Sequence, residues 1–349
     1  MGATLADVVR PPRANYIRRM RRTLVLVGLW LLASCAPSPV LEGHEETTET
    51  TTGGETAAPT GPAPSFLVMP SRVFARIDVS RIRASPVGPD IASAIRSTQS
   101  WQTYAGSSGI DPIASFDAIV IGADAVYADR RTILIRHTET DAAVRDAILR
   151  MSVARGAAPT WSDEDGLAVA VPPQSLPVPH SVVLTAEHEV VLTPSDDVAR
   201  VASVARDQAR RRAAAADAID PALAFAPNEV VVIHVDEPPP RRPGWPEPPQ
   251  RYDLWVVEDP ATHGVEVRFH GDFDTAEHAH ASREWVAQQA AYYASQMLVR
   301  AAGLARPLEA LELTEQGTAL DGRTTFTVDE LRRALGAVAL MQLSGGATP

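Results

Sequence analysis

Two residue types are almost missing from this chain of 349 residues. Lysine does not occur, so all 32 basic residues are arginine, and cysteine occurs once, at Cys35. The absence of lysine excludes a Schiff-base lysine, a phosphate-loop lysine and a Ser-Lys dyad. A single cysteine excludes a disulfide within the chain. The folded part must therefore be stabilised by its hydrophobic core.

Positive charge is also scarce. The 32 arginines stand against 43 acidic residues, which gives a formal net charge of −11. A chain this acidic repels polyanions, so we expect no nucleic-acid partner. The sequence has no G-x-G-x-x-G, no phosphate loop and no H-E-x-x-H. We therefore predict no cofactor and name no catalytic residue, and we lean toward a protein that is not an enzyme.

The apolar run nearest the N-terminus is short. Residues 24–33 are uncharged and almost wholly apolar, and four arginines lie between positions 18 and 22. Ten helical residues span about 15 Å, half of the ~30 Å hydrocarbon core of a bilayer. A basic segment followed by a short apolar run is typical of a secretory signal peptide. We expect residues 1–34 to be this signal, with translation starting at Met20.

The residues that end the signal carry a resemblance to a known class. Leu32, Ala33, Ser34 and Cys35 resemble the lipobox of bacterial lipoproteins, and the resemblance covers residues 20–35. It implies that the Cys35 thiol receives diacylglycerol, that cleavage precedes Cys35, and that a further fatty acid such as palmitate acylates the new amino group. Membrane lipid would then be a partner of the chain.

The same resemblance implies a location. Position 36 is alanine rather than aspartate, which in lipoproteins of this kind implies export to the outer membrane of the cell envelope, on the periplasmic route. Removal of residues 1–34 takes away six arginines and one aspartate, so the mature chain would carry a charge of −16.

Residues 35–65 are expected to form a lipid-anchored, disordered tether. Positions 36–65 contain seven threonines, five glutamates and several prolines but no basic residue. Such a composition cannot bury enough apolar surface to fold. Thirty flexible residues have a root-mean-square reach of roughly 30 Å, enough to hold a folded part clear of the lipid headgroups.

From residue 66 the pattern predicts an α+β fold of mainly antiparallel sheet, with helices packed on the sheet faces. The element order appears twice, in a first half at 66–220 and a second half at 221–349. Leu134 and Arg268 occupy matching strand positions, as do Thr193 and Thr327 near the closing helices, each pair 134 residues apart. We interpret the two halves as divergent tandem repeats.

The longest predicted helix covers residues 274–303. We expect a capping box of Asp274 and Glu277 at its start. Its expected core stripe is spaced by four, three, four and four residues, which places its members on one helical face. These residues are Val286, Ala290, Tyr293, Met297 and Ala301.

The same helix start contains the only metal-ligand candidates that we name. Glu277 and His280 are three apart and can share one helical face, whereas His278 and His280, two apart, cannot. A capped, solvated first turn explains the cluster without a metal. We therefore assign no metal site and keep Glu277 and His280 as weak candidates.

A proline-rich segment at 237–250 is the strongest candidate for a protein contact. It carries seven prolines around Trp245, with Arg241 and Arg242 beside it. Such a segment is extended and stiff, and a rigid loop with an aromatic tip suits partner recognition. The alternative interpretation, a long connection between two strands, is compatible with it.

These observations define a functional hypothesis rather than an activity. We expect a lipid-anchored cell-envelope protein of unknown specific role, a non-catalytic binding or structural module with an envelope protein as partner. One alternative is an exported hydrolase with a site assembled from distant Ser, His and Asp residues. Another is an accessory subunit of an envelope export or assembly complex.

Overall fold

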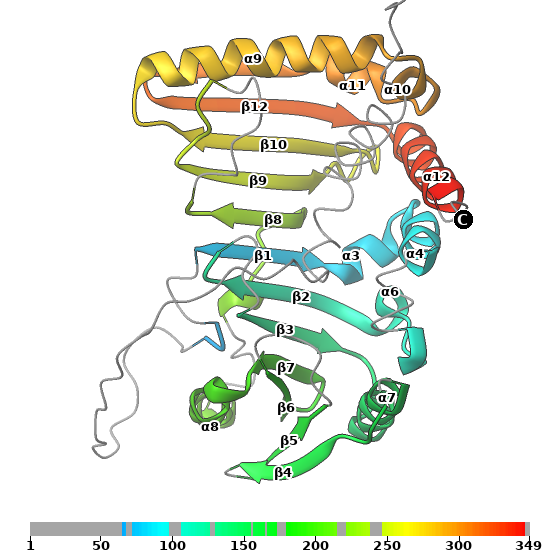
Figure 1. Ribbon diagram of the computed structural model, residues 1–349, viewed down its shortest axis with the longest axis vertical. Coiled ribbons are helices and arrows are strands. Elements are labelled where there is room, and N and C mark those ends of the chain that lie inside the picture. The colour runs from blue at the N-terminus through cyan, green and yellow to red at the C-terminus, as the bar shows by residue number, and fades with distance from the viewer. Residues whose placement is uncertain are drawn as a thin grey trace, which may run out of the picture.

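The folded part is an α+β structure built on one antiparallel sheet (Figure 1). The computed structural model describes residues 65–67, 72–97, 106–125, 130–154, 156–164, 166–172, 179–214, 221–237 and 246–345. The predicted fold class, mainly antiparallel sheet with helices on its faces, agrees with this architecture. The signal, the lipobox and the tether lie outside the described residues.

The twelve strands of the described residues follow the order β11-β12-β10-β9-β8-β1-β2-β3-β7-β6-β5-β4. Neighbouring strands are antiparallel throughout. The strands are β1 (Val73–Asp78), β2 (Phe116–Ala123), β3 (Arg131–His137), β4 (Thr160–Glu164), β5 (Leu167–Val171), β6 (His180–Ala186), β7 (Glu189–Pro194), β8 (Glu229–Val235), β9 (Arg251–Glu258), β10 (Val265–Asp272), β11 (Glu312–Gln316) and β12 (Ala319–Phe326).

Helices connect and cover these strands. The α-helices are α3 (Val79–Ala84), α4 (Gly88–Ser97), α6 (Pro112–Ser115), α7 (Asp141–Ala154), α8 (Val198–Ala214), α9 (Ala276–Ser295), α10 (Met297–Ala301), α11 (Ala305–Glu309) and α12 (Val328–Gly345). The 3₁₀ turns are η1 (Gly106–Ser108), η2 (Ser195–Asp197) and η3 (Pro221–Leu223). Three of these helices, α3, α6 and α11, were not predicted from the sequence.

The two predicted halves meet at the centre of the sheet. β1 pairs with β8 in antiparallel register, with Val73 opposite Val235 and Ile77 opposite Val231. On one side of this seam the order is β1, β2, β3, β7, β6 and on the other β8, β9, β10, β12, β11. The first half continues with an additional hairpin, β5 and β4, at its outer edge.

Side chains alternate between the two faces of the sheet, and most helices cover the same one. We call face A the side that carries Ile119 of β2 and Ile233 of β8. Helices α3, α4 and α6 pack on it near the seam, around Val79 and Ile113. Helix α7 covers its first-half edge, and α9 covers its second-half edge beside Leu320.

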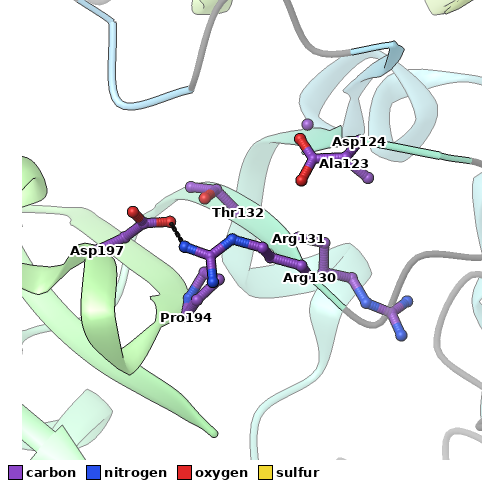
Figure 2. Close-up of a pocket in the computed structure, with 8 residues that line it drawn as sticks. Ala123, Asp124, Arg130, Arg131, Thr132, Pro194 and Asp197 are labelled. Carbon is purple, nitrogen blue, oxygen red and sulfur yellow. Dashed lines mark hydrogen bonds and ion pairs between the residues drawn. The ribbon is translucent and has the colours of Figure 1, made fainter. Parts of the chain in front are cut away.

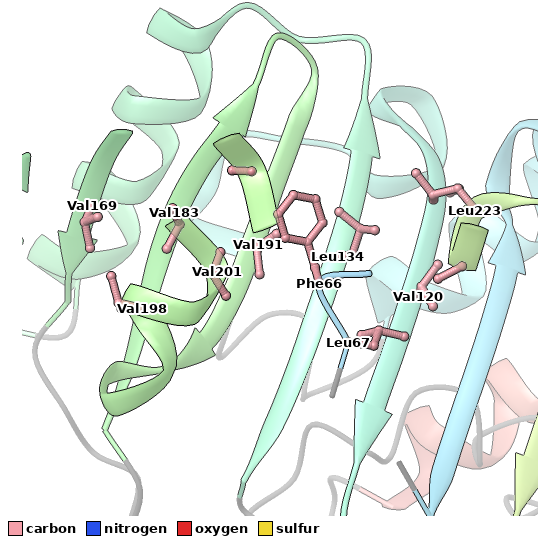
Figure 3. Packing of buried hydrophobic residues seen from close by; sticks show 13 residues of the cluster. Phe66, Leu67, Val120, Leu134, Val169, Val183, Val191, Val198, Val201 and Leu223 are labelled. Atoms are coloured by element: carbon pink, nitrogen blue, oxygen red, sulfur yellow. The ribbon is translucent and has the colours of Figure 1, made fainter. Parts of the chain in front are cut away.

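Face B, the opposite side, is covered in the first half by α8. Val198 and Val201 of α8 lie over Val183 of β6 and Val191 of β7, in one buried cluster with Leu134 and Val120 (Figure 3). Phe66 and Leu67 enter the same cluster and are 1% and 3% exposed. The chain therefore enters the folded part inside a hydrophobic core, because Phe66 and Leu67 are both buried.

The longest helix differs from its prediction in three ways. Helix α9 ends at Ser295 and α10 begins at Met297, so the predicted helix 274–303 is two helices with a break at Gln296. The break shifts the helical phase, so Met297 is 83% exposed and the predicted stripe is wrong beyond Tyr293. Instead of an Asp274 and Glu277 box, the side chain of Thr275 accepts the cap bond.

One glycine of the second half makes room for a core ring. Gly322 of β12 lies directly opposite Phe269 of β10 on face A. A Cβ atom at Gly322 would lie 2.0 Å from the Phe269 ring. The ring therefore occupies the space over a residue without a side chain, which lets α9 approach this edge of the sheet.

Candidate functional site

The main candidate site is the part of face B in the second half that no described helix covers. Among the described residues, the helices that contact β8 to β12 do so from face A. We call this surface the open face. Its polar and aromatic members are His234, Arg251, Asp253, Trp255, Glu266, Arg268, His270, Asp272, Glu312, Thr314, Gln316, Asp321, Arg323 and Thr325.

The strands that build the open face have a clean alternating pattern. In β10, Val265, Val267 and Phe269 point to face A, so the residues between them point to face B. In β3, by contrast, Ile133, Leu134 and Ile135 are consecutive, so apolar side chains lie on both faces. The pattern of β3 thus suits a strand that is buried on both faces. The pattern of β10 suits a strand with one buried and one solvated face.

Register places histidine and aspartate in one row across the open face. His234, Asp253, His270 and Asp321 lie directly opposite one another on β8, β9, β10 and β12, and Thr314 of β11 continues the row. The ring of His234 contacts the Asp253 carboxylate. Each histidine thus has an acidic neighbour on the next strand.

His270 is held between two carboxylates. Its Nδ1 lies 2.8 Å from Asp321 Oδ1, and its Nε2 lies 3.1 Å from Asp272 Oδ1. The hydrogen bond to Asp321 is the largest cause that raises the pKa of His270, burial opposes it, and Asp272 adds to the rise. With an acceptor at each nitrogen, the ring is stabilised as the doubly protonated cation.

A second row runs beside the first. It contains Val232, Trp255, Arg268, Arg323 and Glu312, in register across the same five strands. Arg268 binds the two oxygens of Glu266 at 2.8 and 2.9 Å, and this contact lowers the pKa of Glu266. The charged groups of the open face are therefore arranged as neutralised pairs.

Arginine also pairs across strands at both ends of the open face. Arg323 Nη2 lies 2.6 Å from Glu312 Oε2, and Arg251 Nη2 lies 2.5 Å from Asp272 Oδ2. These side chains are about half exposed or more, apart from Asp272. They present both donors and acceptors to solvent.

A small pocket lies in the first half, beside the start of α8 (Figure 2). It has room for little more than one water molecule. Arg130 lies in it 2.7 Å from Asp196 and 3.0 Å from Asp197. These contacts raise the pKa of Arg130 and lower that of Asp196. The pocket is an ion-pair crevice, and no histidine lines it.

A buried polar cluster lies where β3 leads into α7. Ser115 Oγ lies 2.5 Å from Glu139 Oε1, and His188 Nδ1 lies 3.0 Å from the Glu139 carbonyl. The His137 ring packs edge-on against His188 with centroids 5.9 Å apart. Burial and the neighbouring His188 both lower the pKa of His137. These contacts tie the strand end to the β6–β7 turn, with Ser115 bonded to a carboxylate.

The residues that we named from the sequence are distributed as follows. His280 contacts Glu315 at 3.1 Å and Glu284 at 3.5 Å, and Glu277 lies in the first turn of α9. Among the described residues no three His, Cys, Asp or Glu side chains form a group that could hold a metal ion. Trp245, Arg241 and Arg242 lie outside the described residues.

The open face itself was not predicted. His234, Asp253 and Asp321 lie on three strands that are far apart in sequence, so only the register brings them together. The available signal was the alternation of β10, where four polar residues are interleaved with apolar ones. That signal indicates a strand with one buried face, but it does not indicate which strands pair with it.

Comparison with known proteins gives no family. No protein-family model and no curated protein matches the chain. A solved structure described as "Structure of crystal form IV of TP0453" is similar to it at 9% identity, with a TM-score of 0.40, over 75% of this chain and 91% of that one. In the part that the structure describes, no helix has the length and apolarity needed to cross a bilayer.

Proposed function

We propose that this chain is a lipid-anchored protein of the bacterial cell envelope, at the outer membrane. The observation that carries the proposal is Leu32-Ala33-Ser34-Cys35 directly after a basic and then apolar segment. Cys35 would be the first residue of the mature protein and its acylated anchor. More than one acyl chain would give firm retention, since a single chain binds membranes only marginally.

We further propose that the folded part is a non-catalytic binding or structural module. The open face supports this, because it is a sheet surface of five strands with paired charges rather than a cleft around one reactive group. The proline-rich segment around Trp245 remains the proposed contact for an envelope protein. Binding through surfaces requires no cofactor, which agrees with the motifs that the sequence lacks.

We also propose that the two halves arose by tandem duplication. The strand order on the two sides of the seam supports it, as do the strand lengths. β2 and β9 each have eight residues, and Arg251 comes 135 residues after Phe116. β10 begins at Val265, 134 residues after β3 begins at Arg131.

The test of the anchor compares the parent chain with Cys35→Ser in cells grown with labelled palmitate. The parent should incorporate label and sediment with membranes after a salt wash, and the variant should do neither. Ser34→Ala, which keeps a small residue before the cysteine, is the matched control and should behave as the parent. The proposal would be contradicted if the parent incorporates no labelled palmitate or if the Cys35→Ser variant still sediments with membranes.

A further inference from the structure

We propose that the open face binds a polysaccharide whose flat sugar rings lie across strands β8 to β12. The inference rests on the proposed role of the folded part as a binding module and names the ligand class of one surface. It does not depend on the lipid anchor.

The spacing of the rows fits a chain of equatorially linked sugars. Strands are about 4.8 Å apart, so each five-residue row spans about 19 Å across the sheet. One strand spacing is close to the length of one pyranose unit in a β-1,4-linked chain. A sugar strand laid along the row from His234 to Thr314 would therefore meet a new polar side chain at nearly every unit.

The chemistry of the rows suits hydroxyl groups. Arginine fork donors and carboxylate acceptors alternate within hydrogen-bond distance of each other, as at Arg268 and Glu266. A hydroxyl both donates and accepts, so it can bind between the two members of such a pair. The pairs also hold the side chains in place before a ligand arrives, which reduces the entropy lost on binding.

Trp255 supplies the apolar contact that a sugar ring needs. It is partly exposed, lies beside Val232 and Arg268 in the second row, and among the described residues is the only Trp, Tyr or Phe side chain on the open face. The indole ring offers a flat apolar area for the C–H groups of a pyranose, next to polar groups for its hydroxyls. The combination of one ring with paired charges is what distinguishes this surface from an ordinary solvated strand face.

The charge balance selects against other classes of partner. The open face carries three arginines and two histidines against five carboxylates. A surface so nearly balanced does not attract nucleic acid or anionic lipid, which need net positive charge. A protein interface of standard size has several apolar anchors at its centre, whereas here Trp255 is the only large one. A neutral polysaccharide needs neither net positive charge nor several apolar anchors, so it fits this surface better than nucleic acid, anionic lipid or a protein.

The test uses the full chain with Cys35→Ser, so that the result is independent of acylation. A soluble hexamer of β-1,4-linked N-acetylglucosamine is titrated to millimolar concentration while backbone amide and indole NMR signals are followed. Shifts should concentrate on β9, β10 and β12 and on the Trp255 indole. An α-1,4-linked glucose hexamer, whose chain coils instead of lying flat, is the matched ligand and should bind at least tenfold more weakly.

Variants assign the binding to this surface. Trp255→Ala and Asp321→Asn should each weaken the binding at least tenfold, whereas Tyr292→Ala, an exposed aromatic of α9, should leave it unchanged. Absence of shifts with the β-1,4-linked hexamer, or shifts confined to another surface, would overturn the inference. A protein from envelope extract that is captured by the parent and lost with Trp255→Ala, when the hexamer does not bind, would assign the open face to a protein instead. In either case the acylation result stands separately.

Discussion

At the scale of single residues, His137 and His270 occupy opposite environments. His137 is 3% exposed at the end of β3, where burial and His188 disfavour its cationic form. His270 is on the open face, where Asp321 and Asp272 favour that form. The two rings therefore respond to pH with opposite signs.

For His137 we expect stability to fall as the solution becomes more acidic. Its pKa is lower in the folded than in the unfolded state, so the unfolded chain takes up a proton as the pH drops below about 6.5. His137→Gln removes this titration. Urea unfolding at pH 7.5 and pH 5.0 should show a smaller pH dependence in the variant, and an unchanged dependence would contradict the assignment.

For His270 the sign reverses. The raised folded pKa means that its contribution is fully present below about pH 6.5 and is lost as the pH rises through the folded value. The groups that face it are Asp253 on β9, Asp321 on β12 and Asp272 on its own strand. NMR titration of the ring should give a midpoint above that of a free histidine, and Asp321→Asn should lower this midpoint. An unshifted midpoint in the parent would contradict the view that Asp321 and Asp272 stabilise the cationic form of His270.

The ion pair between Arg212 and Glu189 is the residue contact whose loss should cost most. Arg212 Nη2 lies 2.7 and 2.9 Å from the two oxygens of Glu189, whose side chain is only 7% exposed. Arg212→Ala leaves this carboxylate buried and unpaired, so the free energy of unfolding should fall by about 3 kcal/mol. Chemical denaturation measures it.

Arg210→Ala, on the same helix, is the control for that prediction. Arg210 is 65% exposed and pairs with Asp207 at the surface, so its removal should change stability by no more than about 0.5 kcal/mol. A paired replacement, Arg212→Met with Glu189→Leu, should be less harmful than Arg212→Ala alone. Equal losses in both arginine variants would mean that burial of the carboxylate is unimportant.

At the scale of elements, helix α12 is fixed at its first turn. Thr327 and Glu330 form a reciprocal capping box, with bonds of 2.8 Å from Thr327 N and 3.3 Å from Glu330 N. Glu330 also binds Arg306 at 2.5 and 2.6 Å, the largest cause that lowers its pKa to about 2. One carboxylate therefore connects α11, the end of β12 and α12.

Glu330→Gln should lower the free energy of unfolding by about 2 kcal/mol at pH 7, because the cap and the ion pair both weaken. The carboxylate contributes fully above its unfolded pKa of about 4.5, and this contribution is lost as the pH falls from there to about 2. Parent and variant should therefore converge in acid. Glu277→Gln in the first turn of α9 is the control and should have little effect at either pH.

Sequence reasoning succeeded for elements with a strong period and failed where tertiary contacts decide. Strands β2 and β3 and the hairpin β6–β7 could be predicted from their apolar runs and turn residues. The break at Gln296 could not, because the residues around it are ordinary helix formers and the exposed Met297 looked like part of a stripe. Strand β4 was missed because its one large apolar residue, Trp161, is flanked by polar ones.

The candidate site shows the same limit more sharply. Each strand of the open face could be predicted alone, yet the neighbours of His270 depend on a register that joins residues 253, 270 and 321. A polar row across a sheet has no local signature. The helix-start cluster that we singled out instead, with Glu277 and His280, was visible because its members are adjacent in sequence.

At the scale of the whole molecule, the two halves share a single seam in the sheet. β1 and β8 are rich in apolar residues, and each would become an exposed edge if the halves were separated. Helix α12 also reaches back to the first half, where Arg332 lies 3.5 Å from Asp90 and 3.1 Å from the Pro86 carbonyl. Each half is therefore completed by the other.

We expect residues 66–220 and 221–349, expressed as separate chains, to be poorly soluble alone and to form a one-to-one complex when co-expressed. The reason is that an exposed apolar edge strand pairs with strands of other chains, which leads to aggregation. Size-exclusion chromatography with light scattering measures both states. A half that remains a well-folded monomer by itself would contradict this view of the seam.

The burial of Phe66 and Leu67 has a mechanical consequence. Any pull on the chain N-terminal to them acts first on two side chains lodged between α8 and the sheet, not on a loose surface loop. Force from that direction must extract an aromatic ring from the interior before it can peel a strand. Phe66 thus resists force applied at this end of the folded part, and Phe66→Ala should lower the force at which single molecules begin to unfold.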